Sequence, residues 1–130
     1  MPVVISTDER RQWIWVRVTG ALTIEDTLAI IRTARAPVDR RMWPLFIDAS
    51  GATATMSDAD VETAVAEVRV AAGQGPRGHV ALVSSDDQLF DRLLLYETLC
   101  ADAGIRLIRV FRKHADAEKW LEILSAARHF

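Results

Sequence analysis

Acidic and hydroxyl side chains cluster directly after two short apolar runs of the sequence. Asp48 and Ser50 follow the run 45–47, and Ser84-Ser85-Asp86-Asp87 follows the run 80–83. If both runs are parallel strands, their carboxyl ends meet at one edge of a sheet, where open α/β proteins place their ligands. A hydroxyl at such an edge becomes a nucleophile only beside a base. Neither cluster contains a histidine, so we expect helix capping and hydrogen bonding there and predict no catalytic residue.

The histidines and the single cysteine lack the spacing of metal or catalytic sites. His79, His114 and His129 are isolated, and neither an H-x-x-x-H nor a C-x-x-C pair occurs. Cys100 falls in the apolar register of a predicted helix, which favours a buried, unreactive thiol. We therefore predict no metal site and expect ordinary histidines at surfaces and element boundaries.

Residues 73–78 match the pattern G-x-G-x-x-G of dinucleotide-binding loops. In those loops the glycines follow a strand and open a helix, whose first turn binds the pyrophosphate. Here the pattern ends a predicted helix and precedes a strand, and Pro76 removes one backbone donor. We interpret it as a connecting loop, and we predict no cofactor.

The elements that must position these residues alternate along the chain. Strands are predicted at 3–7, 13–19, 44–48, 80–83 and 105–112, and helices at 24–36, 57–72, 88–103 and 115–127, with a hairpin loop at 8–12 and a small-residue turn at 49–53. Strands separated by helices favour parallel pairing with right-handed crossovers. The prediction is an α/β fold in the order β-β-α-β-α-β-α-β-α. It forms a single domain over residues 1–130, with one mixed, largely parallel sheet of about five strands and about four helices.

Composition and charge argue against several classes of function. The chain has 130 residues, 50% of them hydrophobic, and a net charge of −2. This balance gives no general attraction to nucleic acid, so we expect no nucleic-acid partner. No apolar run reaches the roughly 18 residues of a membrane span, and the first residues lack the basic and apolar parts of a signal peptide. With one cysteine the chain cannot form an internal disulfide, and we expect a cytoplasmic protein.

Two apolar features exceed what a simple core needs. Trp13 and Trp15 share one face of their strand. Either the C-terminal helix covers that face, with Trp120 stacked there, or the tryptophans form an exposed patch for a partner or ligand. The helix 88–103 carries apolar residues over much more than a narrow stripe, among them Leu94-Leu95. Deep burial and a homodimer explain this excess equally well, and a lipid-like ligand under the helix is a third alternative.

Around Asp48 the sequence resembles the STAS domains, the SpoIIAA-like anti-sigma factor antagonists of bacteria. The resemblance lies in a strand ending in Asp48, the turn Ser50-Gly51 and Ser57 at a helix start. The entry Gly20–Thr23 to the first helix and the ending 110–121 fit as well. As a pattern it covers most of the chain, and it is closest to a divergent SpoIIAA-like branch, whose fold is shared with the CRAL-TRIO lipid-binding domains.

This resemblance implies a regulatory role for Ser57. In the antagonists the helix-opening serine is phosphorylated by a partner kinase, and a phosphate adds about −1.5 to −2 charges, enough to switch a docking surface. Met56 stands where the family has aspartate, and Asp58 and Asp60 add negative charge beside the site. The alternative is that Ser57 is a helix N-cap whose hydroxyl accepts a hydrogen bond from the backbone N–H of Asp60.

Two functions therefore stand as hypotheses. The first is a non-enzymatic regulatory or scaffolding module that binds an unidentified protein partner through residues 48–60, with Ser57 as a candidate phospho-switch. Its contact residues would be Asp48, Ser50, Gly51, Thr53, Met56 and Asp58. The second is a carrier of a small apolar or lipid-like ligand in a CRAL-TRIO-like cavity. A carrier needs an enclosed apolar cavity of several hundred Å³, whereas a docking module needs a filled core.

Overall fold

Five strands form one mixed sheet in the order β1-β2-β3-β4-β5. The computed structural model describes residues 3–33 and 40–128. The strands are β1 (Val3–Asp8), β2 (Trp13–Leu22), β3 (Leu45–Ala54), β4 (Val80–Val83) and β5 (Ile108–Phe111). β1 pairs antiparallel with β2, and the other neighbours pair in parallel. The predicted mixed, largely parallel sheet is confirmed.

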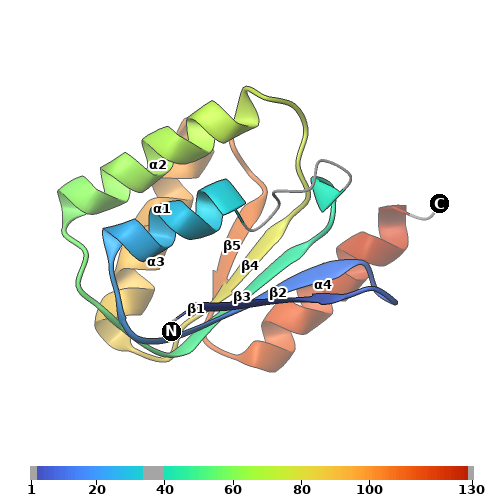
Figure 1. Cartoon of the computed structure of the whole chain (residues 1–130), viewed down its shortest axis with the longest axis horizontal. Helices are drawn as coiled ribbons and strands as arrows, with labels where there is room; N and C mark the ends of the chain where they lie inside the picture. The colour runs from blue at the N-terminus through green and yellow to red at the C-terminus, as the bar shows by residue number, and fades with distance from the viewer. Residues whose placement is uncertain (1–2, 34–39, 129–130) are drawn as a thin grey trace.

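Four helices cover the two faces of this sheet, in the predicted order. Figure 1 shows α1 (Ile24–Thr33), α2 (Asp58–Ala72) and α3 (Asp87–Asp102) on one side and α4 (His114–Arg128) on the other. Side chains alternate between the two layers, since Ile14 and Val16 of β2 lie in the core under α1–α3, whereas Trp13 lies in the cluster under α4. None of the helices in the described part of the chain has both the length and the apolar character needed to cross a bilayer.

Two strands extend further than the sequence predicts. β2 continues past Gly20, and β3 continues through the predicted turn at 49–53. The two extensions pair with each other, with Thr19 opposite Gly51, after a register shift in which the step from Arg17 to Thr19 matches the longer step from Asp48 to Gly51. The small residues of this segment are compatible with a turn or a strand, and backbone pairing to β2 decides for the strand.

The last strand is shorter than predicted because part of it completes a helix end. Gly104 has a φ of +86°, and the backbone N–H of Ile105 donates to the carbonyl of Cys100 at 2.8 Å. This is the hydrogen-bond pattern that closes a helix with a left-handed glycine, so β5 starts only at Ile108. The predicted last turn of the first helix, residues 34–36, lies outside the described residues.

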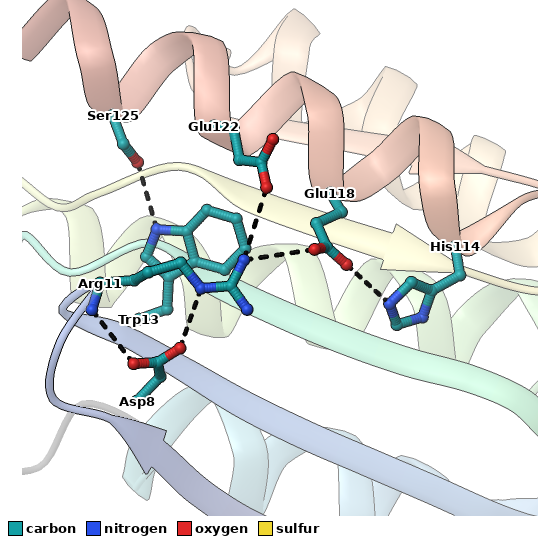
Figure 2. Close-up of polar contacts among 7 residues, drawn as sticks. All are labelled: Asp8, Arg11, Trp13, His114, Glu118, Glu122 and Ser125. Carbon is teal, nitrogen blue, oxygen red and sulfur yellow. Dashed lines mark hydrogen bonds and ion pairs between the residues drawn. The ribbon is translucent and has the colours of Figure 1, made fainter.

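A polar network ties the β1–β2 hairpin to α4 (Figure 2). Arg11 donates through Nε to Asp8 at 2.9 Å, and its Nη1 reaches Glu118 of α4 at 3.3 Å. The same guanidinium lies 4.2 Å from the ring centroid of Trp13, whose Nε1 donates to Ser125 Oγ at 3.2 Å. The hairpin therefore holds α4 against the sheet at several points along the helix.

Candidate functional site

An apolar pocket of about 460 Å³ lies between the sheet and the layer of α1, α2 and α3. Leu45, Val80 and Ile108, the first residues of three neighbouring parallel strands, line it from the sheet. Val68 of α2 and Tyr96 of α3 line it from the helices. The pocket thus opens at the amino-terminal ends of the strands, opposite the edge where the sequence predicts polar side chains.

Small residues leave the space for this pocket. Ala71 and Ala72 end α2, and Gly75, Gly78 and Gly104 lie in the connections beside it, and all five line the pocket. Gly78 is required by close packing, since a β-carbon there would lie 2.3 Å from the carbonyl oxygen of Met42. The G-x-G-x-x-G pattern is therefore a connecting loop, as its order along the chain indicates, and it borders a ligand-sized pocket.

Two arginines supply the charge around the pocket. Arg77 is half-buried, and its Nε donates to the carbonyl of Ala71 at 3.1 Å, while Arg106 is exposed. Burial, followed by the nearby charge of Arg41, lowers the pKa of Arg77. Among the described residues that line the pocket, none is acidic.

A smaller cavity of about 50 Å³ continues the pocket into the core. Ile30, Ile47 and Tyr96 line both spaces, and the smaller one reaches Met56 at the far end of the helical layer. The residues that line the smaller cavity are mostly aliphatic. A seam of loosely filled apolar space therefore runs beneath α1, α2 and α3.

The polar clusters that the sequence predicts at two strand tips come together in the structure. Asp48 Oδ1 accepts hydrogen bonds from the backbone N–H and the hydroxyl of Ser50, at 3.0 and 2.6 Å. Ser85 Oγ donates to the carbonyl of Ser50 at 2.8 Å, which links the tips of β3 and β4. Asp86 is the N-cap of α3, because its carboxylate accepts from the backbone N–H of Leu89 at 2.9 Å. These polar groups hold the backbone in place.

Sequence reasoning missed His114 at this edge. Its Nδ1 lies 3.9 Å from Asp48 Oδ2, its Nε2 lies 3.0 Å from Glu118 Oε2, and its ring stacks on Trp15. β5 ends at the same edge as β3, so the parallel topology is the signal that could have placed His114 there. The Ser50 hydroxyl donates to the other oxygen of Asp48, Oδ1, at 2.6 Å.

No protein-family model matches this sequence, and no curated protein matches it. The resemblance to STAS domains therefore stays a prediction, and the function has to be inferred from the geometry of the site.

Ser57 occupies the N-cap of α2. Its hydroxyl accepts from the backbone N–H of Asp60 at 3.1 Å, and the Asp60 carboxylate accepts from the backbone N–H of Ser57 at 3.1 Å. This reciprocal pair is a capping box. The hydroxyl is exposed, and the neighbouring Asp58 forms an ion pair with Arg92 of α3.

The other residues predicted to contact a partner differ in their exposure. Ser50, Gly51 and Thr53 are exposed along the extension of β3, and Asp48 is half-buried. Met56 is 7% exposed and belongs to the core. Its side chain therefore faces the inside of the protein and is not available for contact with a docked partner.

The face that carries Trp13 and Trp15 lies under α4. Trp13 is 1% exposed and Trp15 is half-buried, so this face is covered and Trp13 is not part of an exposed patch. Trp120 of α4 packs against the same cluster as Trp13, and its ring centroid lies 5.6 Å from that of Phe111.

The apolar residues of α3 divide between core and surface. Leu89, Leu93 and Cys100 are buried, so much of the apolar excess of this helix lies in the core. Leu95 is half-buried, and Leu94 is 38% exposed. A homodimer through this helix stays a prediction.

The histidines and the cysteine occupy separate places. Within residues 3–33 and 40–128, no three His, Cys, Asp or Glu side chains converge to hold a metal ion. His79 meets Trp120 edge-on, and His129 lies outside the described residues. Burial raises the pKa of the Cys100 thiol to about 11.

Proposed function

We propose that this protein binds a small apolar ligand, without transforming it, in the pocket between the sheet and the α1–α2–α3 layer. The observation that carries the proposal is the apolar space of about 460 Å³. Pockets that enclose small molecules usually measure about 300–1,000 Å³ and are lined mainly by apolar side chains. A ligand that fills this space would remove exposed apolar surface of the ends of β3, β4 and β5 from water, which favours binding.

The same observation favours this proposal over the docking hypothesis. A docking module has no need of unfilled space in its core, whereas a carrier cannot work without it. The Ser57 hydroxyl already accepts a hydrogen bond as the cap of α2, which accounts for a serine at that position. A phospho-switch at Ser57 and a protein partner at residues 48–60 stay predictions.

A non-catalytic role also agrees with the contacts at the strand tips. The Ser50 hydroxyl donates to Asp48 and has no hydrogen bond to His114 among the described contacts. Nucleophilic catalysis needs that direct contact between the hydroxyl and its base.

The test is a fluorescence titration with Nile red, a neutral apolar dye, on the full chain. Ala71→Trp places a large side chain in the pocket wall near the end of α2 and should weaken Nile red binding at least about tenfold. Ala66→Trp makes the same substitution at an exposed position of the same helix and should bind the dye like the original protein.

The proposal fails if the original protein does not bind Nile red, or if Ala71→Trp, shown to be folded by circular dichroism, binds it as tightly as Ala66→Trp. Native mass spectrometry of freshly purified protein provides a second readout, in which a retained small molecule supports the proposal.

A further inference from the structure

The two arginines that line the pocket lie at the same end of neighbouring strands. Arg77 belongs to the connection from α2 to β4, and Arg106 belongs to the connection from α3 to β5. β4 and β5 pair in parallel, with Val80 opposite Ile108. Each arginine lies a few residues before one member of this pair. Arginines of two separate connections therefore line one pocket.

Arg77 carries its charge at a cost that an anion would offset. The side chain is half-buried, and Arg41, whose Nη1 donates to the carbonyl of Gln74 at 2.9 Å, lies close enough to add repulsion. Both effects disfavour the charged guanidinium. The described residues that line the pocket include no carboxylate that could compensate.

The rest of the pocket is apolar. Leu45, Ile47 and Leu82 face it from the sheet, and the continuation toward Met56 is lined mostly by aliphatic side chains. Among the described residues, Arg77 and Arg106 are the charged ones that line the pocket, and Arg92, which lines the smaller cavity, forms an ion pair with Asp58. The charge that borders the pocket itself therefore lies on two connections beside it, which is the pattern that matches a molecule with one charged end.

We infer that the ligand is an amphipathic anion, with its carboxylate or phosphate head at Arg77 and Arg106 and its apolar tail between the sheet and α1–α3. This inference rests on the proposed function. Guanidinium groups bind carboxylate and phosphate oxygens through paired N–H donors, which gives the head both charge and direction.

The first test compares ligands that differ only at the head. Dodecanoate, dodecyl phosphate, dodecanol and dodecylamine compete with Nile red on the full chain. Because the tails are equal, differences in competition measure the head. We expect dodecanoate or dodecyl phosphate to compete at about tenfold lower concentration than dodecanol, and dodecylamine to be the weakest. The comparison of dodecanoate with dodecyl phosphate identifies the preferred head.

The second test removes the arginines. Arg77→Gln and Arg106→Gln should each reduce the preference for the anionic ligand over dodecanol several-fold, and the double variant should abolish it, with competition by dodecanol measured on each variant as the internal reference. Arg109→Gln removes the same charge from the adjoining strand, on the sheet face that α4 covers, and should keep the full preference. Arg106 is exposed, so its variant keeps the test decisive if Arg77→Gln lowers stability.

The outcomes separate the two proposals. A protein that does not bind Nile red overturns the proposed function. A protein that binds Nile red but treats dodecanol and both anionic ligands alike overturns only the inference about the head. A preference that survives in the folded double variant also overturns it, since the anion would then be recognised elsewhere.

Discussion

Replacing Gly78 by alanine is expected to destabilise the fold at the entrance of the pocket. A β-carbon at this position would lie 2.3 Å from the carbonyl oxygen of Met42 and 2.8 Å from that of Trp43. Both oxygens belong to the backbone and cannot rotate away as a side chain would. The backbone N–H of Gly78 also donates to the carbonyl of Arg41 at 3.1 Å, which keeps the two segments together.

The expected change in the free energy of unfolding is the net result of opposing effects. Alanine restricts the unfolded chain, which by itself would stabilise the fold by about 0.4–1 kcal/mol. Overpacking of this kind costs about 1–3 kcal/mol, and losing the hydrogen bond between Gly78 and Arg41 adds about 1 kcal/mol. The free energy of unfolding should therefore fall by about 1–3 kcal/mol. With about 4 °C for each kcal/mol, the melting temperature should fall by several degrees.

Urea denaturation followed by circular dichroism measures this change, with Gly51→Ala as the matched control. A β-carbon at Gly51 would meet Thr19 Cγ2 at 3.4 Å, an ordinary contact, so this variant should be neutral or slightly stabilised. Nile red titration of Gly78→Ala should in addition show weaker binding, because Gly78 lines the pocket. Equal stability of the two alanine variants would refute the reasoning.

Three further predictions concern single contacts. Ser57→Ala removes the acceptor for the Asp60 backbone N–H and should cost about 1 kcal/mol in urea denaturation, whereas Ser57→Asp, which retains a cap, should cost little. The side-chain hydrogen bond from Arg11 lowers the pKa of Asp8 below 3.8, so its contribution to stability is present above about pH 4 and is lost as the pH falls further. Asp8→Asn should remove that acid loss from the melting-temperature profile, and an unchanged profile would contradict it. Burial raises the pKa of Cys100 to about 11, so the thiol should react with Ellman's reagent near pH 8 only after denaturation, and rapid reaction of the native protein would count against its burial.

The sequence predicted the layers of the fold because alternation along the strands is a local signal. Ile14 and Val16 point to one layer and Trp13 to the other, as their spacing indicates. The prediction of a turn at 49–53 is wrong, because β3 continues through this segment. The small residues of the segment are compatible with either structure. Pairing with a distant segment of β2 decides the outcome, and no local pattern encodes that pairing.

The pocket was not predicted because it is the space left where several elements end. Residues such as Ile30, Val68 and Ile108 line the pocket but are far apart in sequence, and their side chains are of the types expected in an ordinary hydrophobic core. The one local signal was the glycine pattern at 73–78, which suggests a phosphate loop but serves close packing at Gly78. The contact of His114 with Asp48 was missed for a similar reason, since it depends on two strands ending at one edge.

The sheet also divides the tryptophans of the chain into two groups. Trp13, Trp15 and Trp120 belong to the α4 layer, whereas Trp43 packs against the core layer that contains the pocket. Intrinsic emission therefore has two spatially separate sources, and subtracting the spectrum of a Trp43→Phe variant isolates the one on the ligand side. The entry of a guest molecule and the detachment of the C-terminal helix can thus be followed as separate optical signals by comparing the original protein with that variant.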